Sequence, residues 1–492
     1  MIDFNRFYRQ AVVYTVGNFV YRAAAFLLVP LYVRMLPTAA YGTLELITTT
    51  VVIIQSVLGS GVAHSALRFY FEYEDIEDRK AVISTALIAS FVLSAVGAIL
   101  AIFAAPTLST LVFDSTEYTL AFRIACISMV LEISREINLA YVRARERAGL
   151  FIIMSLVQLC TQVGASLIAV VYLHLGVVGI LAGNVVAKFC VWAVLTTFTM
   201  RDCGWHFRKE MLAPVARYGQ PLMFAMLVGS IFQSLDRFFL NGFISLQALG
   251  LYALAIRFAS IIPVLVVTPF TNTYGPYRLS IMRDPGAPQV YQKIAKYYLI
   301  VAAGIMLVVG GFSREVVRVF AAPEYWPAWT VVPLLLIPGT LGGLTYCFQT
   351  GIYLRKSTKH LFYISTITGC INALGLLLLI PPFGMFGAAI AAVLAYGYTI
   401  VHNYIAAQKL MPITYNIGEL ARIFAISCGL MGLACLIQMD SIWHAALAKT
   451  FVIALYPACI VFANVIDAGE LQRLREMASV RTLKHQVKGA AS

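Results

Sequence analysis

The sequence predicts an all-α polytopic membrane protein built from a duplicated unit. Of its 492 residues, 60% are hydrophobic and 12% are charged, whereas a soluble chain of this length needs a larger charged surface. Apolar runs of about 20 residues, long enough to cross a bilayer, recur along the chain. The pairs Arg9/Arg217 and Gly42/Gly250 have the same spacing (217 − 9 = 250 − 42 = 208), which indicates two copies of one unit.

The apolar runs predict about fourteen transmembrane helices joined by short loops. They cover roughly residues 11–33, 43–65, 81–105, 118–141, 150–173, 177–200, 216–240, 249–271, 294–313, 328–352, 361–380, 385–407, 419–438 and 443–465. The duplication assigns six helices to each of two lobes. The predicted domains are the lobes at 1–208 and 209–416, two additional transmembrane helices within 417–466 and a basic cytoplasmic tail at 467–492.

Lys and Arg residues predict the orientation of the chain in the membrane. They gather near the N-terminus, in alternate loops such as 143–147, and in the tail, while the opposite loops carry little beyond Arg34, Arg314 and Arg318. Basic loops stay in the cytoplasm, so both termini are predicted to be cytoplasmic. Because each copy has an even number of spans, both copies enter the membrane from the same side. A pseudo-twofold axis along the membrane normal then relates the lobes.

The net charge of +13 follows from these basic loops and does not indicate a nucleic-acid partner. The first apolar run is too long for a signal peptide, carries Arg22 and lacks a small-residue cleavage site. The nine cysteines form no CxxC pair and the seven histidines have no ligand spacing. We therefore expect no metal site, no cofactor and no disulfide framework.

Several basic residues lie inside the predicted spans, where an ionised side chain costs about 2.5–3.5 kcal/mol to insert. Arg22, Lys188 and Arg257 have no acidic neighbour within one helical turn, and Arg123 lies in the outer half of its span. Either they pair with acids on other helices, or Lys188 snorkels to the surface, or they line a shared cavity and hold an anion. Arginine suits phosphate because its planar fork donates two parallel hydrogen bonds.

Acidic residues in the spans have two readings. Glu132 and Glu136 are four residues apart, with Arg135 on the same broad face of one helix. They form an internal ion pair with Arg135, or one of them is a carboxylate that couples transport to a proton or cation. Two further candidates for ion coupling lie near outer ends of spans: Asp236, which could also pair locally with Arg237, and Glu45.

Two segments carry a resemblance to a known family. Residues 22–47 contain the run Leu-Pro-x-x-x-Tyr-Gly, and residues 217–261 contain Ser-x-Asp-Arg-Phe-Phe-Leu. The chain resembles, over its full length, the polysaccharide-type (Wzx-like) flippases of the multidrug/oligosaccharidyl-lipid/polysaccharide exporter superfamily. The resemblance implies that Arg22 and Arg257 match cavity arginines of helices 1 and 8 in related flippases. Helix 2 departs from that pattern, because its arginine, Arg68, lies at the inner end.

The resemblance also implies a function and a location. The chain would move a polyprenyl-pyrophosphate-linked oligosaccharide from the cytoplasmic to the outer leaflet of the bacterial inner membrane, by alternating access. The pathway would be O-antigen, capsule or exopolysaccharide synthesis, with its polymerase or export machinery as a candidate partner. Arg22 and Arg257, with Lys188 and Arg123, would hold the pyrophosphate while the prenyl tail stays in lipid.

Two other functions compete with this one. A cation-coupled multidrug antiporter of the same fold predicts unpaired acids lining the cavity, whereas the deepest charges without a local partner are basic. A membrane glycan ligase or polymerase predicts catalytic groups in a sizeable outer loop. The longest outer loops, 106–117 and 313–327, are short and hold no acid–base constellation. We therefore expect a transporter and not an enzyme.

Overall fold

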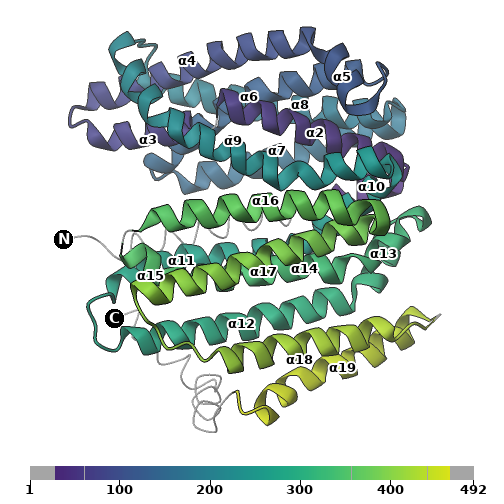
Figure 1. Ribbon diagram of the computed structural model, residues 1–492. Coiled ribbons are helices and arrows are strands. Elements are labelled where there is room, and N and C mark those ends of the chain that lie inside the picture. Colours follow the sequence, from purple (N-terminus) through teal and green to yellow (C-terminus); the bar gives the residue numbers. More distant parts are fainter. Residues whose placement is uncertain (1–27, 60, 356, 440, 466–492) are drawn as a thin grey trace, which may run out of the picture. The chain divides into compact units, whose positions relative to one another are not determined.

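The computed structural model describes residues 28–59, 61–355, 357–439 and 441–465, and its described part consists of helices joined by short turns (Figure 1). Twelve of these helices are long and apolar enough to cross a membrane. The predicted all-α membrane fold is confirmed. The first predicted span lies mostly outside the described residues. The predicted span 118–141 is a helix, Thr119–Ala144, whose charged residues keep it out of the apolar set.

The chain forms two compact units, each described here by itself. The first contains residues 1–257, 320–331 and 369–395. Its complete helices are α2 (Thr38–Leu58), α3 (Val62–Glu72), α4 (Ile76–Phe103), α5 (Ala105–Phe113), α6 (Thr119–Ala144), α7 (Ala148–Leu167), η1 (Ile168–Tyr172), α8 (Gly176–Cys203), η2 (Lys209–Met211), α9 (Leu212–Phe243) and η4 (Pro323–Thr330). Most of α10 (Leu246–Ala259) belongs to it as well.

The second unit contains residues 258–319, 332–368 and 396–492. Its complete helices are η3 (Pro263–Val267), α11 (Thr268–Ser280), α12 (Ala287–Gly311), α14 (Val332–Phe348), α15 (Thr350–Leu354), α18 (Ile417–Leu436) and α19 (Ile442–Phe462). Most of α13 (Ser313–Phe320) lies here, while α16 (Thr358–Phe383) and α17 (Met385–Leu410) are shared between the units. The division of the lobes after residue 208 stays a prediction.

Local sequence signals explain where several helices begin and end. Pro37 directly precedes α2, where its missing N–H costs no helical hydrogen bond. Gly384 has a φ of +54° and joins α16 to α17 in a single-residue turn, a conformation that glycine adopts without strain. Asn416 caps α18, since its side chain accepts a hydrogen bond from the Glu419 N–H at 3.2 Å. The helix pattern is therefore set largely by short-range chemistry.

A 35-residue span, Leu246–Ser280, is interrupted in its middle by the π-helical turn η3. Pro263 opens this turn and cannot donate a backbone hydrogen bond, which favours a local departure from α-helical pairing. The Thr268 hydroxyl donates to the Pro263 carbonyl at 2.9 Å. The interruption separates α10 from α11, and the border between the two compact units falls just before it.

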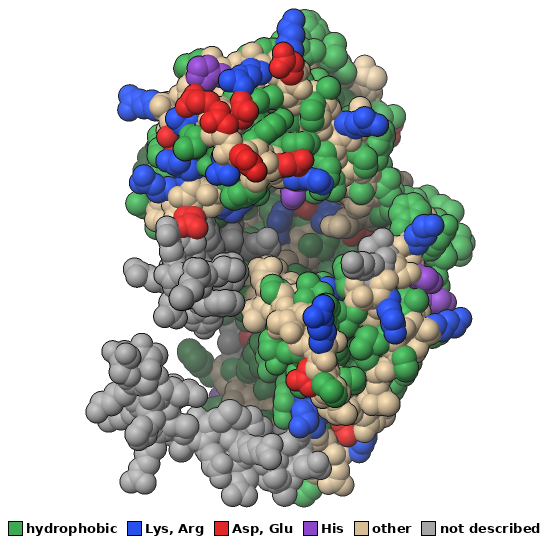
Figure 2. All heavy atoms as spheres, turned by 90° about the vertical axis from the view of Figure 1, so that its left-hand side faces the viewer, with side chains coloured by type: hydrophobic (Ala, Val, Ile, Leu, Met, Phe, Trp, Pro, Cys, Tyr) green, Lys and Arg blue, Asp and Glu red, His purple; other side chains and the backbone are tan. Residues whose placement is uncertain are grey.

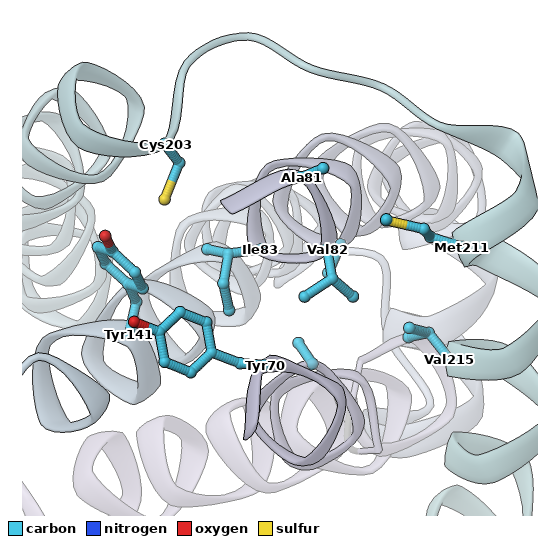
Figure 3. Packing of buried hydrophobic residues seen from close by; sticks show 10 residues of the cluster. Tyr70, Ala81, Val82, Ile83, Tyr141, Cys203, Met211 and Val215 are labelled. Carbon is cyan, nitrogen blue, oxygen red and sulfur yellow. The ribbon is translucent and has the colours of Figure 1, made fainter. Parts of the chain in front are cut away.

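A buried core holds one end of the first unit together. Tyr70 and Tyr141 meet edge to face with ring centroids 5.9 Å apart, and Val82 and Met211 pack in the same cluster (Figure 3). The Tyr141 hydroxyl donates to Asp202 at 2.6 Å. By contrast, large apolar side chains such as Phe103 are exposed, as expected for surfaces that face lipid.

The 3-10 segment η4 is anchored to the first unit by a tyrosine. The Tyr325 hydroxyl donates to the Leu36 carbonyl at 2.9 Å, and its ring lies 6.1 Å from that of Tyr41. Burial raises the pKa of Tyr325, so its hydroxyl keeps its proton and stays a donor. This contact fixes the backbone just before α2.

Candidate functional site

Four charged side chains from three helices form one network in the first unit. We call them the Glu45 cluster: Glu45 of α2, Asp236 and Arg237 of α9, and Arg257 of α10. The Glu45 carboxylate accepts from Arg257 Nη2 at 2.8 Å and from Arg237 Nε at 3.2 Å. Both of its oxygens are therefore occupied by guanidinium groups from different helices.

The second acid of the cluster completes the network. Asp236 accepts from Arg237 Nη1 at 2.8 Å and from the Tyr252 hydroxyl at 3.0 Å. The two acids and two arginines of the cluster sum to zero formal charge. The Glu45 side chain is 9% exposed, whereas that of Arg257 is 48% exposed. The charge that an incoming ligand can reach in this cluster is therefore positive.

Two glycines bring the helices of this cluster together. A Cβ on Gly42 would lie 2.2 Å from the Leu246 carbonyl oxygen, and one on Gly250 would lie 2.0 Å from that of Thr38. Only glycine permits so close an approach of α2 and α10. Glu45 follows Gly42 by three residues and Arg257 follows Gly250 by seven, so each shares a helix face with its glycine. The two side chains therefore meet across the crossing.

A second charged cluster lies on α6 and α8. Glu132 binds the Arg135 guanidinium, and the Lys188 ammonium lies 3.4 Å from the same carboxylate. The predicted internal ion pair on α6 is confirmed. The neighbouring Glu136 is exposed, and the described residues give it no hydrogen-bond or ion-pair partner. Arg123, also on α6, is exposed and has no such partner within the described part of the chain.

The structure changes how the predicted basic residues are understood. Of the alternatives left open for Lys188 and Arg257, pairing with an acid on another helix is confirmed for both residues. The sequence could not identify which acids are the partners, because the paired residues are 56 and 212 positions apart (188 − 132 = 56; 257 − 45 = 212). Arg22 lies outside the described residues. The local Asp236–Arg237 pair is confirmed, and Arg237 additionally binds Glu45.

An apolar pocket of about 250 Å³ lies in the second unit. Helices α12, α14, α17 and α18 line it, with almost wholly apolar side chains such as Leu299, Leu344, Ile400 and Phe424. A pocket with an almost wholly apolar lining suits a hydrocarbon chain and disfavours a charged ligand.

Comparisons with known proteins agree with this architecture. The chain is similar to the lipid II flippase MurJ in an inward closed conformation, with a TM-score of 0.75, 14% identity, and coverage of 92% of this chain and 99% of that one. It is also similar to an inward-facing multidrug resistance MATE family transporter of the MOP superfamily (TM-score 0.61, 15% identity, 84% and 99% coverage). A mutant of the Vibrio cholerae MATE transporter VcmN matches with a TM-score of 0.56, 16% identity, and 82% and 96% coverage. At these identities the likeness establishes the fold.

No curated protein matches the chain. A sequence profile described as "Polysaccharide biosynthesis protein" matches residues 7–282, which is 276 of the 492 positions (282 − 7 + 1 = 276). The profile thus covers more than half of the chain and includes the whole Glu45 cluster. This membrane protein belongs to the polysaccharide biosynthesis protein family and has the fold of the MurJ flippase and the MATE transporters.

Proposed function

We propose that this protein is a flippase for a polyprenyl-pyrophosphate-linked oligosaccharide. It moves the lipid from the cytoplasmic to the outer leaflet of the bacterial inner membrane, by alternating access, for O-antigen, capsule or exopolysaccharide synthesis. Arg257 holds the pyrophosphate together with Arg22, and Lys188 and Arg123 assist. The family assignment supports a role in polysaccharide synthesis, and MurJ, which shares the fold, is named a lipid II flippase.

One observation carries the proposal: among the charged side chains of the Glu45 cluster, that of Arg257 is the most exposed. The planar fork of an arginine can donate two parallel hydrogen bonds to a pair of pyrophosphate oxygens. The acids of the cluster are covered and already bound to arginines, so they offer little to a cationic substrate. The apolar pocket of the second unit supports a substrate with a hydrocarbon tail.

The membrane potential supports transport in the proposed direction. An anionic headgroup leaving a cell that is negative inside gains about 2.3 kcal/mol per charge for each 100 mV. A binding site that serves both end states must hold the headgroup with similar affinity in each. Consumption of the lipid on the outer side then maintains net outward movement.

Complementation tests the proposal. In a strain that lacks this gene and accumulates the lipid-linked precursor, we expect Arg257→Ala or Arg22→Ala to abolish glycan export while the protein stays in the membrane. Arg22→Lys should keep part of the activity, because charge remains but the bidentate fork is lost. Export is measured as surface glycan, normalised to the amount of protein in the membrane fraction.

A matched control separates this role from a general loss of charge. Arg201, exposed at the end of α8, can be replaced by alanine, and export should stay at the wild-type level. Normal export by both Arg22→Ala and Arg257→Ala would show that these arginines do not grip the transported anion.

Glu136 supports a second candidate function, the cation-coupled multidrug antiporter. It is an exposed carboxylate on a predicted span, with no hydrogen bond or close ion pair in the described part of the chain. An antiporter predicts that Glu136→Gln abolishes drug resistance conferred by the protein. If the protein is a flippase, it should confer no drug resistance. Comparing the drug susceptibility of cells with and without the protein therefore distinguishes the flippase from the antiporter.

A further inference from the structure

An arginine lies buried in a box of tyrosines at one end of α11. Arg278 is only 4% exposed. Its guanidinium carbon lies 4.2 Å from the ring centroid of Tyr353, 4.5 Å from that of Tyr346 and 5.8 Å from that of Tyr274. All four residues belong to the second unit, on α11, α14 and α15. We call this group the Arg278 box.

The framework of the box is held in place independently of the guanidinium. The Tyr274 hydroxyl and the Thr350 hydroxyl are 2.8 Å apart, and the Tyr291 hydroxyl donates to the Arg278 carbonyl at 2.7 Å. These bonds fix one wall and the backbone that carries the cation. The position of Arg278 is therefore imposed by the surrounding fold.

The guanidinium lacks strong acceptors. Nη2 donates to the Tyr346 hydroxyl over a long 3.4 Å, and the buried Nε and Nη1 atoms have no acceptor among the described residues. No carboxylate of the described residues pairs with Arg278. The acid closest in sequence, Asp284, accepts from the Gly286 N–H at 2.8 Å within its own turn. A buried cation whose N–H groups are unused is an unfavourable arrangement unless something else binds it.

The tyrosine rings satisfy only part of this cation. The face of a tyrosine ring attracts the positive charge of the guanidinium group. The N–H bonds of that group, however, lie in its plane and point outward, where they need hydrogen-bond acceptors. The in-plane donors remain available to a planar or tetrahedral anion. A phosphoryl group matches them well, because two of its oxygens accept parallel hydrogen bonds from one arginine.

An anion can reach the box from one side. Tyr353 is 36% exposed, so a rotation of this surface side chain would uncover the guanidinium. The exposed basic residues Arg283 and Arg355 lie in the adjoining loops, and the exposed Lys359 lies at the start of α16. Figure 2 shows mainly Lys and Arg, and few acidic side chains, on this face of the second unit. A positive rim of this kind raises the local concentration of anions.

We propose that the Arg278 box is a phosphoryl-binding site, distinct from Arg257, at the end of α11 that is predicted to be cytoplasmic. Arg278 Nε and Nη1 donate to two phosphoryl oxygens, and Tyr346 and Tyr353 enclose the guanidinium. The phosphoryl group comes from a lipid headgroup of the inner leaflet or from a free phosphate compound. The inference stands whether or not the protein transports glycan lipids.

Thermal unfolding of the full-length protein in uncharged detergent tests the site. The probes are inorganic pyrophosphate, phosphatidylglycerol added to the micelles, and phosphatidylcholine as the zwitterionic control. Wild-type protein should unfold at a higher temperature with pyrophosphate or phosphatidylglycerol than with phosphatidylcholine. The Arg278→Gln variant should lose that gain, with apparent affinity at least about tenfold weaker, and Arg278→Lys should keep part of it.

Two controls make the result specific. Arg283→Gln removes an exposed arginine five residues away and should leave the gain intact. The titrations are repeated with the Arg257→Ala variant, which lacks the site proposed for the transported headgroup. A gain in unfolding temperature that persists in this variant belongs to the Arg278 box, so the two proposals are tested separately. A response to pyrophosphate alone identifies a free phosphate compound as the source, and a response to phosphatidylglycerol identifies a lipid headgroup.

A site-resolved measurement covers the case in which Arg278→Gln does not fold. Phenylglyoxal modifies arginine side chains, and mass spectrometry of the wild-type protein reads modification at Arg278 and Arg283 separately. Bound pyrophosphate or phosphatidylglycerol should protect Arg278 at least about fivefold and leave Arg283 unprotected, as for a charge-assisted contact at one arginine. Equal modification of Arg278 with and without both probes would overturn the proposal.

Discussion

At the residue scale, the most deeply buried charge in the described part of the second unit belongs to Lys449 of α19. Its side chain is 1% exposed, and its ammonium lies 2.7 Å from the carboxylate of Glu315 and 2.9 Å from the carbonyl of Gly311. Both ions have lost their hydration, so each depends on the other. The pair ties the last helix to the end of α12 and to α13.

Removal of one member of this pair should destabilise the protein. We expect Lys449→Met to lower the free energy of unfolding by about 3–5 kcal/mol, because it leaves the Glu315 carboxylate buried and uncompensated. The double variant Lys449→Met/Glu315→Leu should recover most of that loss. Denaturant unfolding in detergent measures both, and the exposed Lys409→Met at the end of α17 serves as control. Equal losses in the single and double variants would show that the two charges do not depend on each other.

At the element scale, the crossing of α2 and α10 is the contact on which the candidate site depends. Gly42 and Gly250 each lie against backbone of the other helix, and the two occupy equivalent positions of the predicted repeat. A residue that touches its own repeat equivalent must lie close to the axis that relates the copies. If the predicted repeat is correct, the crossing lies close to the pseudo-twofold axis expected from the sequence.

A single methyl group should disturb this crossing. We expect Gly42→Ala to lower the free energy of unfolding by at least about 1–3 kcal/mol, the usual penalty for overpacking, because its Cβ would overlap a backbone carbonyl. It should also reduce glycan export by displacing Glu45 from Arg257. The matched control is Gly229→Ala in α9, where the new Cβ meets nothing within 4 Å. That change should be neutral or stabilise by about 0.5–1 kcal/mol. Similar effects of the two changes would mean that α2 and α10 are not in tight contact.

Charge pairing at the element scale also shows what the sequence can and cannot reveal. Glu132 and Arg135 are three residues apart on one helix, so helical spacing alone predicts their contact. The Glu45–Arg257 pair joins helices far apart in the chain, and its geometry depends on where α2 crosses α10. No propensity or periodicity sets that crossing. The available signal was the pair of glycines at equal repeat positions, each followed by a charge on the same helix face.

At the scale of the whole molecule, the membrane makes the fold class predictable. Lipid offers no hydrogen bonds to backbone groups, so long apolar runs must become helices, and their approximate positions can be read from composition. The predicted span 118–141 was found despite its charges, and α6 occupies Thr119–Ala144. The Arg278 box was not foreseen, because it joins an arginine at the end of α11 to tyrosines of α14 and α15 that only tertiary packing brings near.

The orientation of the whole chain remains a prediction of its basic loops. A reporter enzyme active only in the cytoplasm, fused after Ser492, should be active, because the basic tail is retained on that side. The same reporter inserted in the loop after α5, near Ser115, should be inactive. Activity in the reverse pattern would invert the assignment of both termini and of the Arg278 box to the cytoplasmic side.

The duplication has a consequence for the Glu45 cluster. The repeat equivalents of Glu45 and Arg257 are Ala253 and Thr49 (45 + 208 = 253; 257 − 208 = 49), and both are buried and uncharged. Those of Asp236 and Arg237 are Leu28 and Val29 (236 − 208 = 28; 237 − 208 = 29), also buried. The charges of the cluster are therefore not repeated at the equivalent positions of the predicted duplication. Under the proposed function, a headgroup that binds the Glu45 cluster meets charged side chains from only one of the two sets of equivalent positions, and so has a preferred orientation.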